Sequence, residues 1–425
     1  MSDGEPQGPT AEAFPALAEL LADSDRVPIE GARPVLRRLE DEEPELEAEL
    51  ARLGPLEVAL ERRGLWCGRW IELPEELDPR ARLPRASRQR QRVREARPLV
   101  WRGWLSEALP RWRSELFRSE RLPARFAAAL DPARELRAWI AGQLGARGSD
   151  FVLLDEAAPL EDPQRDLAKL LLRAKFLPPD GPPLWAKLGR LSDHPGDASL
   201  RLRLGFGREV DDDDNPDPRG LEAVARLAAR LWPERAAIAG DRRLWAALAE
   251  VFDAPLRPSQ DILYWNRPQG GARFHHDAFR EQDDAQRGVL FAQLAGRTAW
   301  AALSIADLAR RALEFRAELA RGEAPWVLEE LAPSGALEAL DSLAADPLAL
   351  RRELGLPGQG RLGPLIDQAP EFLGFLAERG HAAILHPGDL ILLPNHGRLA
   401  TAMHSVFCAS NAQNLALSLG LFPSR

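Results

Sequence analysis

Hydrophobic and polar residues follow different patterns in different parts of this chain. Over residues 11–65, and again over 99–180, apolar residues recur at the three- and four-residue spacing of helices. The second stretch includes DPQRDLAKLLLRAKF at 162–176, which we predict to be helical. Residues 199–206, SLRLRLGF, alternate strictly between apolar and polar types, and this pattern predicts a strand. Helical spacing returns over 219–252.

The remaining predicted strands gather in the C-terminal part of the chain. They are short segments bounded by turn residues, at 262–266, 273–277, 288–294, 297–303, 383–385, 389–393, 404–408 and 415–421. A helical stretch from about 304 to 380 separates the first four from the last four. Strands grouped in this way predict a small β-barrel or sandwich that is interrupted by helices.

These patterns divide the chain into three predicted parts. Residues 1–10 are polar and rich in Pro and Gly, and we expect a disordered tail. Residues 11–180 are predicted to form a mainly helical N-terminal region, which ends at the breaker sequence PPDGPP, 178–183. Residues 181–425 are expected to form one strand-rich domain with the helical insertion 304–380. The predicted fold class is therefore α+β.

Charge argues against a nucleic-acid partner. The chain has 56 basic and 65 acidic residues, a net charge of −9, and nucleic-acid-binding proteins are usually basic. One basic stretch, 80–97, is rich in arginine. It is either a binding segment for a partner or nucleic acid, or a solvated linker or helix face that pairs with the acidic first fifty residues. We favour the second reading, because no aromatic residues interleave with these arginines.

Composition favours a cytoplasmic protein. With 425 residues, of which 45% are hydrophobic, the chain is long enough to bury a sizeable core. Its two cysteines, Cys67 and Cys408, are too few for a disulfide framework. The N-terminal residues show no basic segment followed by an apolar one, and no apolar run approaches the roughly 20 residues that span a bilayer, so no membrane association is expected.

Candidate chemistry begins at His275 and Asp277, within RFHHDAF. Residues two apart on a strand share a face, so these side chains are predicted to project together, while His276 points away. An imidazole and a carboxylate from one strand, joined by a second imidazole, make the 2-His-1-carboxylate triad of non-haem iron enzymes.

Three separated motifs support that reading. His-x-Asp at 275–277 is followed by FAQLAGRTAW, 291–300, and later by PGDLILLP, 387–394, a histidine and a terminal apolar strand. In type and order these motifs resemble those of the cupin-like, JmjC-type iron(II)/2-oxoglutarate-dependent oxygenases, which include protein hydroxylases. The resemblance covers roughly 260–300 and 383–422 and implies a double-stranded β-helix, or jelly-roll, for the strand-rich domain.

The resemblance implies that His275, Asp277 and His404 hold Fe(2+) and act as the catalytic centre, with 2-oxoglutarate and dioxygen as cosubstrates. His396 is a rival for the third ligand, because it too follows the PGDLILLP strand. We prefer His404, because a β-segment follows it directly. His381 and His386 are predicted to be loop or surface residues.

One position departs from the family. Where many members have a lysine that binds the distal carboxylate of 2-oxoglutarate, this chain has Thr298, and no lysine follows Lys187. If 2-oxoglutarate is used, an arginine must bind it, and guanidinium suits this role because it pairs with carboxylate in bidentate fashion. Arg203 is the first choice and Arg201 shares its strand face, while Arg297 neighbours the family position. Thr298 itself can contribute a hydroxyl.

A formal G-x-G-x-x-G occurs at 358–363, inside the insertion. We do not interpret it as a dinucleotide site, because a helix-like segment precedes it, whereas such sites follow a β-strand. The motif is left without a predicted function.

The sequence thus predicts an Fe(II)-dependent oxygenase, with 2-oxoglutarate as the expected cosubstrate. Its substrate is an unidentified peptide, protein or small molecule. Two alternatives stay open: a metal cupin dioxygenase that works without 2-oxoglutarate, which would fit the missing lysine, and a non-catalytic cupin fold that binds a partner.

Overall fold

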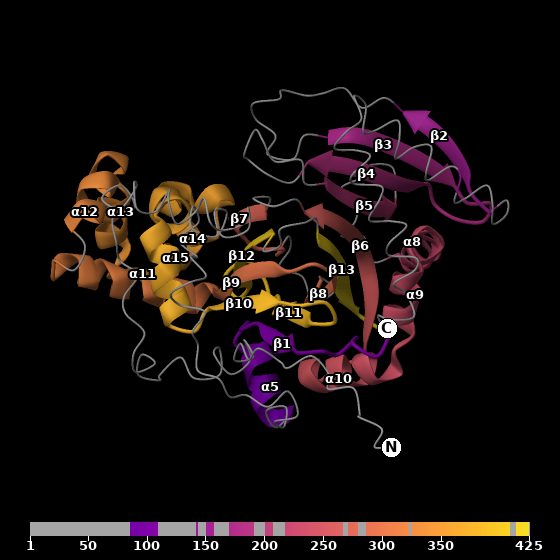
Figure 1. Cartoon of the computed structure of the whole chain (residues 1–425), viewed down its shortest axis with the longest axis horizontal. Helices are drawn as coiled ribbons and strands as arrows, with labels where there is room; N and C mark the ends of the chain where they lie inside the picture. Colours follow the sequence, from indigo (N-terminus) through magenta and orange to yellow (C-terminus); the bar gives the residue numbers. More distant parts are fainter. Residues whose placement is uncertain are drawn as a thin grey trace, which may run out of the picture.

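Two antiparallel sheets form the centre of the molecule, in a computed structural model of the chain (Figure 1). The structure describes residues 86–108, 142, 150–156, 170–190, 200–206, 217–266, 271–278, 286–322, 325–408 and 414–424. The predicted tail and residues 11–85 lie outside these ranges. No helix in the described ranges is long and apolar enough to cross a bilayer.

The larger sheet has nine strands among the described residues. In spatial order they are β1 (Leu99–Trp101), β11 (Leu390–Pro394), β8 (Gly288–Ala295), β13 (Asn414–Pro423), β6 (Leu256–Asn266), β5 (Leu200–Phe206), β4 (Leu184–Arg190), β3 (Leu170–Leu177) and β2 (Val152–Glu156). The smaller sheet has the order β10 (Ala382–Leu385), β9 (Thr298–Ser304), β12 (Ala402–Cys408) and β7 (Gly271–His275). From β6 to β13, the chain thus crosses repeatedly between the sheets.

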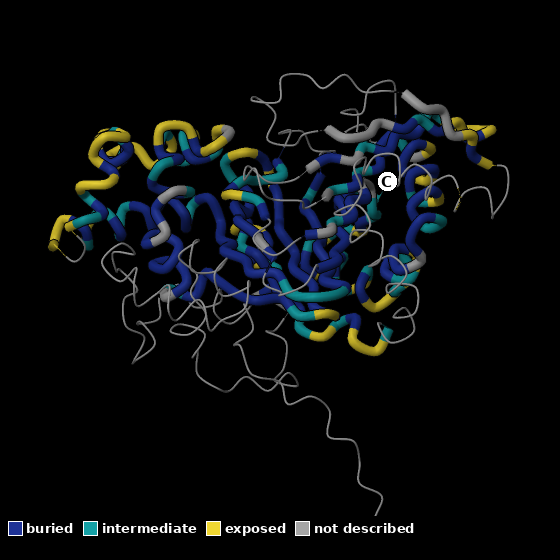
Figure 2. The backbone as a smooth tube through the Cα atoms, turned by 45° about the horizontal axis from the view of Figure 1, so that its top comes forward, coloured by how far each residue is buried: buried dark blue, intermediate teal, exposed yellow. Residues whose placement is uncertain are grey.

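Strand alternation separates three hydrophobic clusters. Side chains such as Phe291 of β8 and Trp300 of β9 fill the space between the two sheets. The neighbouring residues in sequence point outward: Leu290 packs with helices on the far face of the large sheet, and Ala301 packs with the insertion behind the small sheet. Each central strand is therefore buried on both faces, as Figure 2 shows by its dark blue tube.

Helices cover both outer faces. One set consists of α5 (Ala86–Arg94), α8 (Pro218–Leu231), α9 (Pro233–Gly240) and α10 (Arg242–Phe252). The other set is the insertion, with α11 (Ile305–Ala320), α12 (Pro325–Leu331), η3 (Ala332–Ser334), α13 (Ala336–Leu343), α14 (Pro347–Leu354), η4 (Pro357–Leu362), η5 (Pro364–Gln368) and α15 (Pro370–Glu378). The insertion predicted at 304–380 is confirmed as helical, and it forms the orange lobe beside the small sheet (Figure 1).

The prediction of helix at 162–176 was wrong where the structure describes it. Residues 170–177 form strand β3, which pairs with β2 and β4. A short apolar run fits a helix or a strand equally well, and only its pairing partners decide. The turn at 178–183 connects β3 to β4 within one sheet, so the division predicted at residue 180 passes through that sheet.

Part of the arginine-rich stretch is helix α5. Within it, Arg92 is buried and donates a hydrogen bond to the Pro98 carbonyl at 3.0 Å. Just after it, Arg97 binds Asp307 of α11, with Nε 2.9 Å from Oδ2. Arg90 and Arg94 lie within 4 Å of Asp253. These four arginines thus bind groups within the described fold, whereas the acidic first fifty residues, their predicted partners, lie outside the described ranges.

Candidate metal centre

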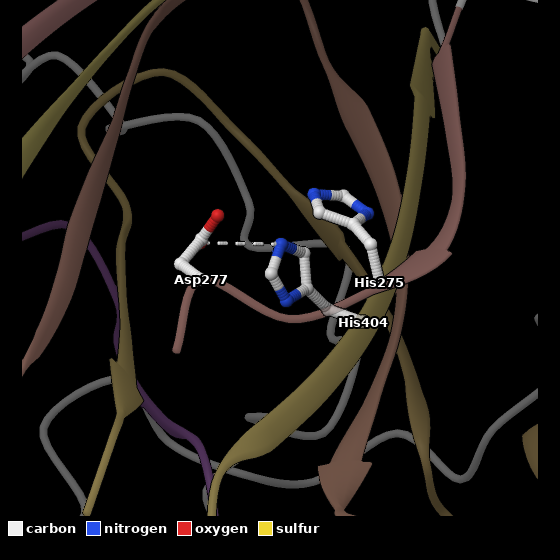
Figure 3. A group of neighbouring side chains, drawn as sticks. All are labelled: His275, Asp277 and His404. Atoms are coloured by element: carbon white, nitrogen blue, oxygen red, sulfur yellow. Dashed lines mark ion pairs between the residues drawn. The ribbon is translucent and has the colours of Figure 1, made fainter. Parts of the chain in front are cut away.

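Three predicted ligands meet between the ends of two strands. His275 is the last residue of β7, Asp277 follows it by two positions, and His404 lies in β12 directly opposite His275. One possible ligand atom from each residue lies within 4.8 Å of the other two. Figure 3 shows the three side chains pointing toward a common space. They form the one such group of His, Cys, Asp and Glu among the described residues.

Hydrogen bonding orients the two imidazoles. His275 Nδ1 is 2.7 Å from the Arg273 carbonyl oxygen. A carbonyl only accepts, so Nδ1 carries the hydrogen and Nε2 keeps its lone pair. His404 has a longer contact of the same type, 3.5 Å from Nδ1 to the Ala402 carbonyl, and its Nε2 is 3.7 Å from Asp277 Oδ2. Both rings thus have Nε2 as the atom available to a ligand.

Burial keeps His404 neutral. Desolvation, together with the nearby His275, lowers its pKa to about 3, and the Asp277 carboxylate opposes the shift only in part. A metal ligand must be deprotonated, so His404 needs to lose no proton before it binds a cation at neutral pH. The three side chains have the chemistry and the spacing that a divalent metal ion requires.

Aromatic residues form the wall of this space. The Trp300 ring lies 5.6 Å from the His404 ring between centroids, and it also contacts Phe291 edge-on at 4.7 Å. Tyr264 lies 5.8 Å from Phe291, and its hydroxyl is 3.3 Å from that of Ser418. The site is therefore bounded by apolar rings, with two hydroxyl groups on the side of the large sheet.

Thr298 belongs to a neutral hydrogen-bond chain. Its hydroxyl donates to Gln293 Oε1 at 2.7 Å and accepts from Trp300 Nε1 at 2.8 Å. The Gln293 amide donates in turn to the Ala295 carbonyl at 2.7 Å. Thr298 is completely buried. The position where the family resemblance implies a lysine is thus filled by polar groups without charge.

Arg203 and Arg201 lie on the inner face of the large sheet. Arg201 is opposite Tyr264 in the register of β5 and β6, and Arg203 is opposite Ile262. Burial raises the pKa of the Tyr264 hydroxyl, whereas Arg201 and, more weakly, Arg203 lower it, and Asp277 raises it. These arginines are therefore close enough to Tyr264 to act on it, and Tyr264 in turn interacts with the candidate metal site.

The third predicted cosubstrate residue, Arg297, is placed differently. It immediately precedes β9, and its carbonyl accepts a hydrogen bond from Asn414 Nδ2 at 3.0 Å. The group of possible ligand atoms consists of His275, Asp277 and His404.

The other described histidines lie outside the cluster. His396 Nε2 is 2.6 Å from the Val93 carbonyl, which removes it as a rival ligand. His276 donates from Nε2 to the Gly355 carbonyl at 3.1 Å, on the insertion side, as strand parity predicts. His381 lies in the loop between α15 and β10, as one of its two predicted placements has it, but it is not on the surface: it is 1% exposed and accepts from Arg311 Nε at 3.0 Å. His386 lies at a turn, where its backbone N–H donates to Asp389.

Sequence reasoning missed the residues that hold the ligand segment. Asn395 donates to the Asp277 carbonyl at 3.2 Å, and Asp367 accepts from the Phe274 N–H at 2.8 Å. Gln359 donates to the Phe274 carbonyl. None is close in sequence to the residue it contacts. Asn395 directly follows the PGDLILLP strand and Gln359 lies within the G-x-G-x-x-G at 358–363, whereas no recognised motif includes Asp367.

Comparisons with known proteins give little further information. No protein-family model matches the chain, and no curated protein matches it. Among solved structures, the ribosomal oxygenase YcfD from Escherichia coli is similar at 13% identity and a TM-score of 0.22, over 65% of this chain and 48% of that chain. The same protein in complex with cobalt and succinic acid has a TM-score of 0.20 at 13% identity, with the same coverage. The chain spans about half the length of these structures.

Proposed function

We propose that this protein is an Fe(II)-dependent oxygenase that uses 2-oxoglutarate as cosubstrate. The observation that carries the proposal is the convergence of His275, Asp277 and His404, each with a ligand atom within 4.8 Å of the others. Two imidazoles and one carboxylate suit a ferrous ion and leave coordination positions for other ligands. When bound, the iron would supply the activation of dioxygen.

The strand order supports a jelly-roll fold for this domain. Between β6 and β13, every step along the chain except β9 to β10 crosses from one sheet to the other, giving the orders β11-β8-β13-β6 and β10-β9-β12-β7. This is the arrangement of two four-stranded sheets that jelly-rolls use. It places the two histidine ligands on neighbouring strands of the smaller sheet.

The chain's own residues have separate tasks in the proposed reaction. His275, Asp277 and His404 would hold the metal, and Trp300 packs against His404 and helps to exclude water. Arg203, with Arg201 beside it on the same face, is proposed to bind the distal carboxylate of 2-oxoglutarate in place of the lysine. Thr298 would contribute an uncharged hydroxyl group beside the site.

A second candidate is an iron-dependent dioxygenase that works without 2-oxoglutarate. The observation in its favour is the chain from Trp300 through Thr298 to Gln293, which fills the family's cationic position with uncharged groups. A peptide, a protein or a small molecule fits either activity as substrate.

Succinate formation tests the proposal. The protein is reconstituted with Fe(II) without oxygen and then exposed to air with 2-oxoglutarate. We expect succinate from the wild type, none from Asp277→Ala, and wild-type amounts from His396→Ala, whose histidine lies outside the cluster. Iron binding without succinate would favour the second candidate. Absence of iron binding would leave the non-catalytic alternative.

A further inference from the structure

The outer edge of β7, the strand that ends at His275, is bound by side chains of the insertion. β7 is the last strand of the smaller sheet in the described structure, so one row of its backbone groups has no strand partner. At Phe274 both groups are bound by side chains instead. Its N–H donates to Asp367 Oδ1 at 2.8 Å, and its carbonyl accepts from Gln359 Nε2.

An unusual turn presents Gln359 to this strand. Gly358, Gln359 and Gly360 have φ angles of 66°, 56° and 54°, in the left-handed region. This region suits glycine but is uncommon for a residue with a side chain. A Cβ at Gly363 would collide with the Gly358 carbonyl oxygen. The G-x-G-x-x-G at 358–363 is thus explained by the geometry of a tight turn around Gln359.

Two features of Gln359 are energetically unfavourable for the turn itself. Gln359 holds a strained backbone conformation, is 1% exposed, and its buried Oε1 has no hydrogen-bond partner in the described structure. The described contact that its amide makes is the one to Phe274, directly before a candidate metal ligand. Strain of this kind persists where the surrounding structure enforces a particular placement.

The other residues of the ligand segment are held as well. His276, between the two ligands, donates to the Gly355 carbonyl at the end of α14. Asn395, after β11, donates to the Asp277 carbonyl at 3.2 Å. The insertion therefore binds the segment before and between the ligands, and the end of a barrel strand binds it at Asp277.

We propose that Gln359 is a positioning residue for the metal centre. The 358–363 turn, together with Asp367, holds the edge of β7 so that His275 and Asp277 face His404 at ligand distance before a metal arrives. This inference rests on the proposed metal site. It assigns to the insertion a role in organising the metal ligands, in addition to any role in substrate binding.

Cobalt affinity tests the inference without requiring turnover. Co(II) is titrated into the full-length protein under nitrogen, with binding followed by calorimetry and by the visible absorption of the bound ion. We expect one site in the wild type, which is lost in His275→Ala. Gln359→Met keeps the length of the side chain but removes its donor, and we expect its cobalt affinity to fall about 10- to 100-fold, as for other residues that orient metal ligands.

Two further variants separate positioning from general stability. Gln359→Gly relieves the positive-φ strain while removing the same donor, so its cobalt affinity should fall as in Gln359→Met even where its thermal stability does not. Leu340→Ala makes a cavity in α13 of the insertion and should lower stability while leaving cobalt affinity within about twofold of the wild type. Wild-type affinity in a folded Gln359→Met or Gln359→Gly would overturn the inference.

Hydrogen exchange on the wild type tests the same coupling without substitutions. Because binding linkage is reciprocal, cobalt should slow amide exchange both in 271–278 and in 357–362. Protection confined to 271–278 would refute a positioning role even if both Gln359 variants failed to fold. Failure of the wild type itself to bind cobalt would instead refute the proposed metal site, which is a different outcome.

Discussion

Acid should destabilise the metal-free protein through two buried histidines. Burial, together with the neighbouring Arg311, whose positive charge makes a second one unfavourable, lowers the pKa of His381 to about 3. His404 is lowered to about 3 by desolvation and by His275. Both rings are therefore neutral in the folded protein over the range in which an exposed histidine takes up a proton.

The sign follows from proton counting. Between pH 6.5 and 3 the unfolded chain binds a proton at each of these histidines and the folded protein does not, so stability falls as pH falls through this window. At pH 4.5, about two units below the unfolded pKa, each histidine costs roughly 3 kcal/mol at about 1.4 kcal/mol per unit. Together they remove about 5–6 kcal/mol of the free energy of unfolding.

Urea unfolding in a chelating buffer at pH 7 and pH 4.5 measures this loss. His381→Gln keeps an acceptor for Arg311 and should remove about half of the difference between the two pH values. His404→Gln should remove a similar share, and the double variant most of what the two contribute, since different charged neighbours act on the two residues. If His381→Gln kept the full wild-type difference, the assignment of this acid sensitivity to buried neutral histidines would be refuted.

Further predictions concern one ion pair, the core and the cosubstrate. Asp389→Ala leaves Arg102 without its partner at 2.6 Å, and the free energy of unfolding measured in urea should fall by about 3–5 kcal/mol; a loss under 1 kcal/mol would contradict this. Phe372→Ala leaves a cavity at a fully buried position beside Phe315 and should lower the free energy of unfolding by about 3–5 kcal/mol in the same assay. An unchanged free energy would show that the position is not tightly packed. Arg203→Met should raise the KM for 2-oxoglutarate at least about tenfold, because a charge-assisted hydrogen bond contributes about 1.5–3 kcal/mol; an unchanged KM would exclude Arg203 as the anchor.

Local patterns predicted much of the sheet structure. The alternation in residues 199–206 is confirmed as β5, and the turn-bounded segments after residue 260 correspond to strands β6 to β13, except that β7 ends at His275, two residues before the predicted end. These predictions succeed because side-chain alternation and turn residues act over a few positions. The apolar run at 170–177 failed the same test, because its own residues are compatible with both structures and its pairing with β2 and β4 decides.

In the candidate site, too, local spacing and motif order predicted some ligands, whereas the structure decided how the residues meet. The His-x-Asp spacing suggested one pair of ligands through strand alternation. Asp277, however, lies two residues past the end of β7, so alternation alone does not place it beside His275. The choice of His404 over His396 came from motif order. The structure places His404 in register opposite His275 and turns His396 to the Val93 carbonyl.

The sequence by itself determined the strands after residue 260, the helical insertion, the one His-x-Asp pair and the absence of a lysine from all positions after Lys187. The tertiary structure alone decided which face of each sheet is inside, that Thr298 joins a neutral buried chain, and that Gln359 reaches across to Phe274. The physical reason is the distance along the chain over which each interaction acts. Secondary structure depends on patterns within a few residues, whereas the register between distant strands and the contacts of an insertion depend on how whole faces pack.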